Sequence, residues 1–203
     1  MICYNKDEID LKFETSDGVF SPTAIDKGTL SMLETVEFSK DDKVLDLGCG
    51  YGFVGIYASC YVCDGQIVMS DVSDEALRMT ECNIELNAAK GIKLIKSYGL
   101  DSIDDNDFTK ILANPPYHED FSVPKNYIEK GYKKLCIGGK MYMVTKRKDW
   151  YKNKFIAVFG GVRIEEINGY YIFIAEKREN KKKPVKDAKK QHLSKKLARK
   201  YGK

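Results

Sequence analysis

The chain has 203 residues, 43% of them hydrophobic and 32% charged, which suits one domain with a sizeable core plus a tail. No apolar run reaches the roughly 18 residues of a membrane span. The charged first residues also lack the apolar core of a secretory signal peptide. We therefore expect a cytoplasmic protein with no membrane partner.

The net charge of +4 is distributed unevenly along the chain. Residues 177–203 contain 13 Lys or Arg and two acids, a net charge of +11, which leaves −7 for residues 1–176. An acidic body with a basic tail indicates a polyanionic partner. We expect the tail to contact nucleic acid; the alternative is a solvated tail that only aids solubility.

The six cysteines do not form a zinc pattern. Cys60 and Cys63 form one CxxC pair, but no second pair has zinc spacing and there are only two histidines. We expect reduced thiols, as in other cytoplasmic proteins, and no metal site.

Strand-like and helix-like segments alternate along the chain. Short apolar runs typical of buried strands lie at 44–48, 66–71, 92–97, 110–113 and 138–145. Helical spacing marks 51–60, 73–91, 123–136 and 149–161. In the clearest helix, Ser73 is the N-cap, Leu86 belongs to the apolar face and Gly91 ends the helix.

The ends of the chain complete the pattern. Residues 162–177 predict an antiparallel hairpin over Asn168-Gly169, and 25–37 predicts a helix packed on the domain after a loop. The alternation as a whole predicts an α/β fold: a doubly wound, Rossmann-like, mostly parallel sheet with a C-terminal antiparallel hairpin.

A glycine-rich loop, DLGCGYGFVG, connects the first of these parallel strands to a helix. Its spacing satisfies the dinucleotide pattern GxGxxG, but the carboxylate of Asp46 would repel a pyrophosphate. Asp46 suits a ligand with an ammonium group, such as S-adenosylmethionine. Asp71 ends the second strand, 21 residues after Gly50, where a carboxylate can accept hydrogen bonds from both ribose hydroxyls.

The loop DLGCGYG resembles the first motif of class I S-adenosylmethionine-dependent methyltransferases, and the order of elements resembles their seven-stranded sheet. The resemblance implies S-adenosyl-L-methionine as the cofactor. The residues that it implies at the cofactor, from the methionine end to the adenine, are Asp46, Gly48, Cys49, Gly50, Asp71, Val72 and Tyr98, with Asn114 beside the methyl group. Many members of the family have an acid where this chain has Tyr98.

The motif NPPY follows the fourth strand and resembles the [Asp/Asn/Ser]-Pro-Pro-[aromatic] motif of methyltransferases that act on planar-conjugated nitrogen. By this resemblance, the side-chain oxygen of Asn114 and the carbonyl of Pro115 accept the two N–H bonds of the target amine, beside the cofactor. Pro115 and Pro116 hold that carbonyl still. Tyr117 stacks on the target base, and His118 contacts the substrate.

Residues 13–33 are similar to the approach segment of the methyltransferase small family, which includes guanine-N2 methyltransferases of ribosomal RNA. The resemblance covers residues 13–177. It implies an approach segment over 1–42, a methyltransferase domain over 43–177 and a flexible basic tail over 178–203. It also implies that Phe20 and the Asp26-Gly28-Thr29 turn frame the cofactor or the target pocket.

These resemblances imply an N-methyltransferase that acts on RNA, with guanine N2 of ribosomal RNA as the leading target. Adenine N6 of RNA or DNA and a protein glutamine remain alternatives, because NPPY occurs in enzymes for both. The alternative from another class is a non-catalytic RNA-binding module that keeps the fold.

Overall fold

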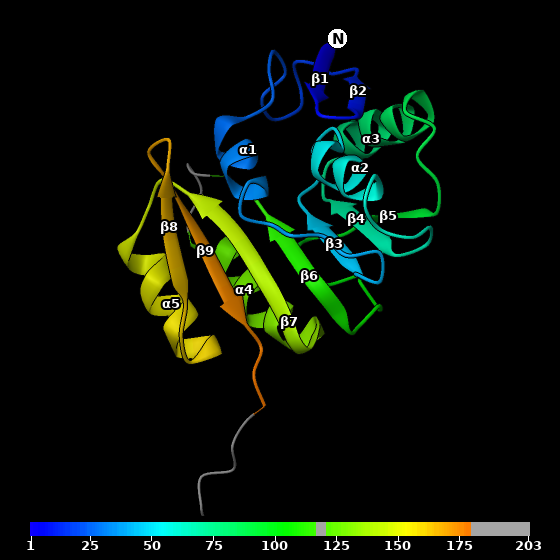
Figure 1. Cartoon of the computed structure of the whole chain (residues 1–203). Coiled ribbons are helices and arrows are strands. Elements are labelled where there is room, and N and C mark those ends of the chain that lie inside the picture. The colour runs from blue at the N-terminus through cyan, green and yellow to red at the C-terminus, as the bar shows by residue number, and fades with distance from the viewer. Residues whose placement is uncertain (117–120, 180–203) are drawn as a thin grey trace, which may run out of the picture.

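The computed structural model describes residues 1–116 and 121–179 and contains a seven-stranded sheet with helices on both faces (Figure 1). The strands of this sheet are β3 (Val44–Leu47), β4 (Ile67–Asp71), β5 (Ile92–Lys96), β6 (Phe108–Ala113), β7 (Leu135–Thr145), β8 (Arg163–Ile167) and β9 (Tyr170–Glu176). The helices are α1 (Lys27–Leu33), α2 (Phe53–Ser59), α3 (Asp74–Leu86), α4 (Ser122–Lys134) and α5 (Asp149–Phe159).

The strand order is β5-β4-β3-β6-β7-β9-β8, and β3 to β7 run parallel. The order reverses between β3 and β6, which is where doubly wound sheets bind ligands, beyond the carboxyl ends of the strands. β9 runs antiparallel to both β7 and β8. The predicted fold class is therefore confirmed, including the seven strands and the C-terminal hairpin.

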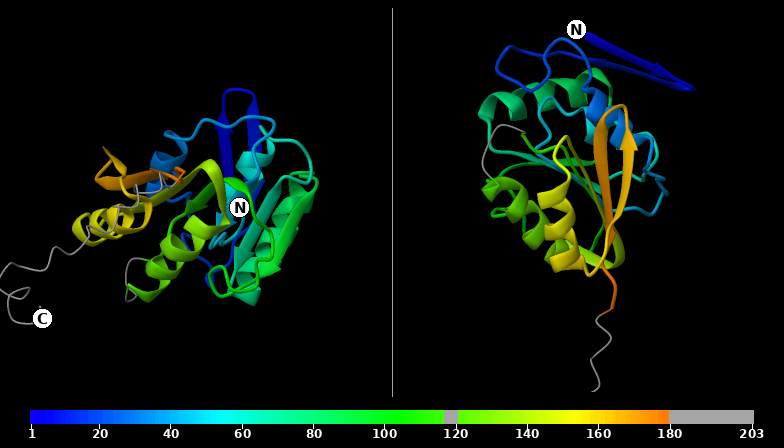
Figure 2. Two further views of the ribbon diagram at one scale, coloured as in Figure 1. Left: turned by 90° about the horizontal axis from the view of Figure 1, so that it is seen from below. Right: turned by 90° about the vertical axis from the view of Figure 1, so that its left-hand side faces the viewer.

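Each face of the sheet has its own apolar core, because side chains alternate along a strand. On β6, Leu112 packs with α1, α2 and α3, whereas Ile111 packs with α4 and α5. Figure 2 shows these helix layers on either side of the sheet. Both cores are fully enclosed at β3 and β6, so the strand ends beside the switch point stand on a rigid base.

The closing hairpin turns over Asn168 and Gly169, as the sequence predicts. Both residues have positive φ, 52° and 77°, which the tight two-residue turn requires. Asn168 Nδ2 also donates to Ser31 Oγ at 3.0 Å, which attaches the hairpin tip to α1.

A small N-terminal hairpin is the main element that sequence reasoning missed. β1 (Ile2–Lys6) and β2 (Ile9–Phe13) pair with each other and not with the large sheet. The hairpin lies over α2 and α3 (Figures 1 and 2). The Tyr4 ring meets Phe53 and Tyr57 edge-on, with centroids 5.2 and 5.7 Å apart. These ring contacts hold the hairpin on the domain.

The prediction for helix α3 is wrong in two details, the end of the helix and its buried face. Ser73 caps it as expected, but the helix ends at Leu86 rather than at Gly91. Leu86, predicted on the apolar face, is 44% exposed, whereas Asn83 is fully buried. Asn83 is buried because its amide bonds the backbone of Glu14, through both N–H and C=O, and the carbonyl of Tyr51.

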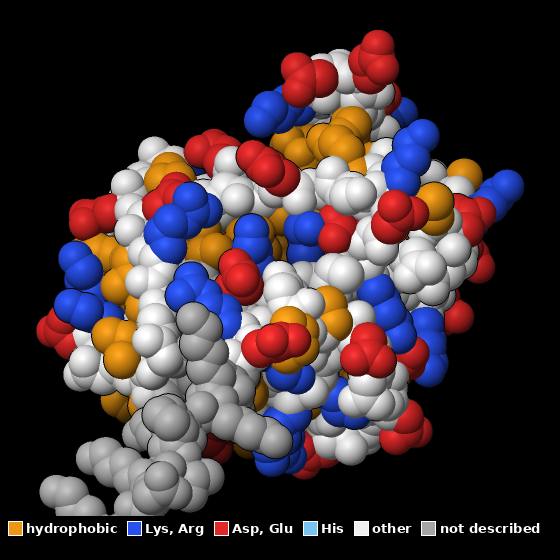
Figure 3. Space-filling model, turned by 60° about the horizontal axis from the view of Figure 1, so that its bottom comes forward, with side chains coloured by type: hydrophobic (Ala, Val, Ile, Leu, Met, Phe, Trp, Pro, Cys, Tyr) orange, Lys and Arg blue, Asp and Glu red, His pale blue; other side chains and the backbone are white. Residues whose placement is uncertain are grey.

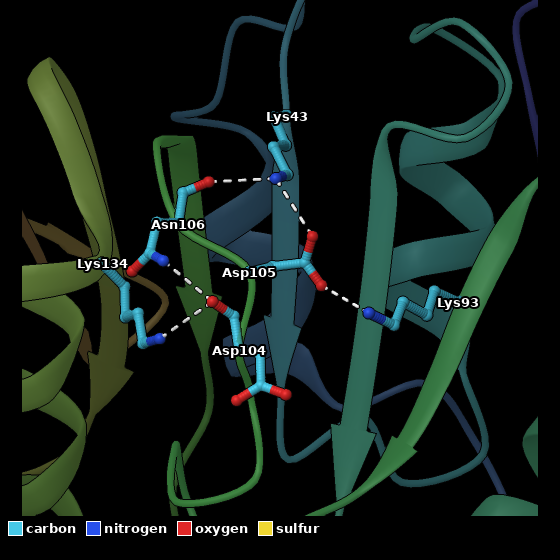
Figure 4. A network of polar contacts seen from close by, with 6 residues as sticks. All are labelled: Lys43, Lys93, Asp104, Asp105, Asn106 and Lys134. Carbon is cyan, nitrogen blue, oxygen red and sulfur yellow. Dashed lines mark hydrogen bonds and ion pairs between the residues drawn. The ribbon is translucent and has the colours of Figure 1, made fainter.

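The amino ends of the parallel strands carry a network of opposite charges (Figure 4). Asp105 accepts hydrogen bonds from Lys43 at 3.2 Å and from Lys93 at 2.6 Å. Basic and acidic side chains are interspersed on the face seen in Figure 3, which looks obliquely from this end. This end of the sheet is therefore a mixed-charge surface and not a basic patch.

Two negative findings concern the described residues alone. No helix in residues 1–116 or 121–179 is long and apolar enough to cross a membrane. The same residues contain no cluster of three His, Cys, Asp or Glu arranged to hold a metal ion. All six cysteines are free thiols, and Cys60 and Cys63 are both exposed.

We predict that Asn83→Ala lowers the free energy of unfolding by about 3 kcal/mol, because the buried carbonyl of Tyr51 and the partly buried N–H and C=O of Glu14 lose their partner. Asn87→Ala is the matched control. Its amide bonds Lys12 in the same manner but at an exposed site, so we expect a loss below about 1 kcal/mol. Urea denaturation measures both; equal losses would contradict the role given to Asn83.

Candidate active site

A pocket of about 320 Å³ opens at the carboxyl edge of the parallel strands. It is lined by the glycine loop, the residues that follow β4, β5 and β6, the start of α4 and the loop before α1. The pocket therefore lies at the switch point, as the fold leads one to expect. It brings together most of the residues that the sequence singles out.

Asp46 lies on β3 at the bottom of the pocket and is only 3% exposed. Its Oδ2 accepts a hydrogen bond from the Gly55 N–H at 2.9 Å. Burial raises the pKa of Asp46 to about 7; the bond from Gly55 opposes the rise and the charge of Asp71 adds to it. A carboxylate in this setting is stabilised by a cation and destabilised by an anion such as a pyrophosphate.

Asp71, at the end of β4, organises the glycine loop. Its Oδ2 accepts from the Gly50 N–H at 3.0 Å and its Oδ1 from the Ser73 N–H at 2.9 Å. Gly48 and Gly50 both have positive φ, 76° and 58°, which lets the loop turn tightly towards the carboxylate. Asp71 is partly exposed, and each oxygen retains acceptor capacity towards the pocket.

The third glycine of the GxGxxG match has a packing role. A Cβ at Gly55 would lie 2.5 Å from the sulfur of Met69, so only glycine lets α2 approach β4. Cys49 is also enclosed, with its sulfur 3.6 Å from Thr80 Oγ1. Burial raises the pKa of this thiol well above its ordinary value, so Cys49 lines the pocket as a neutral group.

Three large apolar side chains stand exposed around the pocket. Phe20, Val72 and Tyr98 are 50%, 57% and 54% exposed, and they are three of the eight large hydrophobic residues that are exposed in the described part of the chain. Their concentration here indicates walls for an apolar or planar ligand. The predicted cofactor-binding residues Asp46, Gly48, Cys49, Gly50, Asp71, Val72, Tyr98 and Asn114 all line the pocket.

Asn114 follows β6 and is held by the cap of α1. Its Nδ2 donates to Asp26 Oδ1 and to Thr29 Oγ1, both at 2.9 Å. Asp26 is the N-cap of α1 and also accepts the Thr29 N–H at 2.9 Å. These bonds fix which end of the Asn114 amide is nitrogen and which is oxygen. They join two segments that are 85 or more positions apart in the sequence.

The structure describes the two prolines of the NPPY motif but not the residues that follow them. Pro115 is buried, and Pro116 is exposed and lines the pocket. Tyr117 and His118 lie outside the described residues. Phe20, predicted at the substrate, lines the same pocket beside Asp26 and Thr29.

Sequence reasoning missed two features of the site. It placed Asp26 and Thr29 near the pocket but did not connect them to Asn114; the visible signal was the Asp-x-x-Thr spacing of an N-cap. It also missed Asn126 on α4, whose Oδ1 is buried beside the pocket and has no hydrogen-bond partner among the described residues. Asn126 offers an acceptor beside Gly99, the residue after Tyr98; a Cβ at Gly99 would lie 2.5 Å from that oxygen.

Comparison with known proteins agrees with this geometry. The model of the methyltransferase small domain matches residues 10–174. The chain belongs to the methyltransferase small family. It is accordingly an S-adenosylmethionine-dependent methyltransferase. The pocket fits that cofactor, since it offers a buried carboxylate for the ammonium group and apolar walls for the adenine.

Individual relatives differ in length. The chain is 29% identical over 174 residues to "Uncharacterized protein YbxB" of Bacillus subtilis, covering 83% of this chain and 87% of that one. It is 31% identical over 144 residues to "Ribosomal RNA small subunit methyltransferase C" of Pseudoalteromonas atlantica, covering 69% of this chain but 41% of the relative. The chain thus spans less than half of that longer enzyme.

A solved structure shares the fold. The Thermus thermophilus 16S rRNA N2 G1207 methyltransferase (RsmC), solved with AdoMet and guanosine, superposes with a TM-score of 0.80 at 23% identity. The match covers 87% of this chain and 50% of that one.

We predict that Asp46→Asn stabilises the ligand-free chain increasingly as pH rises. The folded-state pKa of Asp46 is about 7 and an unfolded Asp titrates near ~3.9, so the wild-type protein loses stability between about pH 4 and 7. Asn carries no such charge. The free energy of unfolding of the Asp46→Asn variant therefore exceeds that of the wild type by an amount that grows across this pH window, towards about 4 kcal/mol at pH 8. Urea denaturation from pH 5 to 8 measures it; a pH-independent difference would contradict the buried charge.

Proposed function

We propose that this methyltransferase acts on an exocyclic base nitrogen of RNA, with guanine N2 of ribosomal RNA as its target. The observation that carries the proposal is the fixed amide of Asn114, held by Asp26 and Thr29 beside the cofactor pocket. Relatives named as methyltransferases of small-subunit and large-subunit ribosomal RNA support ribosomal RNA as the substrate. The guanosine-bound structure with the same fold supports guanine.

The chemistry of such a nitrogen explains why a fixed acceptor is needed. An exocyclic amine is a poor nucleophile, because its lone pair is delocalised into the ring. In our proposal, Asn114 Oδ1 and the Pro115 carbonyl accept its two N–H bonds and draw the nitrogen towards a tetrahedral shape. The lone pair then points at the methyl group. Acceptors that are already in place avoid reorganisation when the reaction occurs.

The clamp on Asn114 determines which of its atoms faces the target. Since Nδ2 is bound to Asp26 and Thr29, the amide cannot rotate its nitrogen into the acceptor position without losing two hydrogen bonds. An Asn that was free to flip could present its N–H donors to the target amine, which would not accept them as partners. The cap of α1 therefore serves as a positioning device for the reaction.

When bound, the cofactor supplies an electrophilic methyl group on a cationic sulfur. Asn114 Oδ1 and the Pro115 carbonyl would orient the target nitrogen towards that methyl group, and the methylated nitrogen would lose its proton to water. We propose that Asp46 holds the ammonium group of the cofactor and that Asp71 holds its ribose. Asp46 is a charge that costs stability until a cation offsets it, which is typical of binding sites.

The remaining assignments concern the target base. We propose that Phe20 borders the base and that Tyr117 stacks on it, a contact of roughly 1–3 kcal/mol. His118 contacts the substrate in this proposal, and the basic tail over 178–203 adds sequence-independent affinity for RNA. A target within a helix would have to be flipped out of the stack to reach the pocket.

We predict that Asn114→Ala lowers kcat at least about 100-fold on ribosomal RNA and leaves cofactor affinity within about twofold. Asp46→Asn should instead act mainly on cofactor binding and lower the affinity for the cofactor. Thr29→Val, which keeps the side-chain shape and removes one acceptor of the clamp, should cost up to about tenfold in kcat. Methyl-transfer assays measure kcat, and calorimetry measures cofactor affinity. An active Asn114→Ala enzyme would refute the role of Asn114 as an acceptor for the target amine.

A further inference from the structure

Three consecutive basic residues follow β7 at the same edge of the sheet as the pocket. Lys146, Arg147 and Lys148 are all exposed. Each cation lies over an aromatic ring: Lys146 Nζ is 5.0 Å from the Tyr170 ring centre, Arg147 is 5.2 Å from that of Phe121 and Lys148 Nζ is 4.8 Å from that of Tyr171. The rings hold the three cations in defined places.

The rings also spread the three cations apart. Tyr170 belongs to the core that contains α1, Tyr171 packs with the opposite core, and Phe121 immediately precedes α4. The cations of neighbouring residues are thus directed over the two opposite faces of β9 and over the start of α4. We call Lys146, Arg147 and Lys148 together the basic stripe.

The basic stripe follows β7, which neighbours β6 on the side away from β3 and the glycine loop. β6 and β7 are paired with Ala113 opposite Met143, so Asn114 and the stripe follow adjacent strand ends. Lys146 lies over Tyr170, whose ring is packed against Gly28 of α1; a Cβ on Gly28 would lie 2.7 Å from the ring. None of the three basic residues lines the cofactor pocket.

The charges around the site explain why a polyanion needs such a stripe. The charged residues that line the pocket are all acids: Asp26, Asp46 and Asp71. A phosphate backbone that approached this edge would be repelled unless cations lay beside the acids. No ion pair between described residues involves the stripe, so its charge is not neutralised by a salt bridge there.

We propose that the basic stripe binds the backbone phosphates of the RNA strand beside the target nucleotide. The inference rests on the proposed RNA methyltransferase function and adds the surface that docks the strand. Each ammonium or guanidinium group over a ring still has N–H donors that point away from the ring and can reach a phosphate oxygen. Contacts to phosphates fix the register of the strand, and the pocket selects the base.

The test compares two triple variants of the full chain. Lys146→Gln/Arg147→Gln/Lys148→Gln removes the stripe. The control, Lys90→Gln/Lys133→Gln/Lys140→Gln, removes the same charge from exposed positions at the amino ends of the strands. Binding to a ribosomal RNA fragment is measured by fluorescence anisotropy from 50 to 300 mM salt, alongside methyl transfer and cofactor affinity.

The stripe variant should lose about 10- to 100-fold in RNA affinity near 0.1 M salt, with a log–log salt slope shallower by about 2. KM for RNA should rise, and cofactor affinity should not change. Each single substitution should remove about a third of the slope change. Equal losses in the stripe variant and the control would overturn the inference. A wild-type chain that binds RNA through the stripe without methylating it would refute the proposed function alone.

Discussion

The amide of Asn114 between Asp26 and Thr29 is the contact on which the site depends. It joins the end of β6 to the cap of α1 and so places the approach segment over the carboxyl edge of the sheet. The parallel sheet by itself provides only two parts of the site, the glycine loop after β3 and the end of β6 before Asn114. One wall of the pocket comes from residues before β3, including Phe20 and Asp26. The first 42 residues thus take part in building the site and do not merely precede the domain.

The hydrogen bonds of Asn83 support the same arrangement from the other side of the pocket. This fully buried side chain on α3 connects Glu14, which follows β2, with Tyr51 of the glycine loop. The glycine loop, which follows β3 and bonds Asp71 through Gly50, is therefore braced by the segment that leads to Phe20. Two asparagines, one on each side, keep the approach segment in register with the sheet. The Asn83 amide donates and accepts at once, and in our proposal the Asn114 amide does the same when the target amine is bound.

The sequence predicts the parallel sheet, the C-terminal hairpin and the residues of the cofactor pocket, since each follows from a local pattern such as the glycine loop or Asn168-Gly169. It does not predict the N-terminal hairpin, whose charged strands are ordered by ring contacts of Tyr4 with α2. It misassigns the buried face of α3 because Asn83 is buried by hydrogen bonds and not by hydrophobicity. Contacts between distant segments, such as Asn114 with Asp26, leave no periodic signal.

The most direct test of the central claim is mass spectrometry of ribosomal RNA nucleosides from a strain that lacks this protein. The account predicts that one N2-methylguanosine is missing, and that it returns with the wild-type chain but not with Asn114→Ala. Loss of a methyl group from adenine N6 would keep the enzyme class and refute the guanine target. An unchanged set of RNA methyl marks, with a methylglutamine missing from a protein instead, would contradict the account.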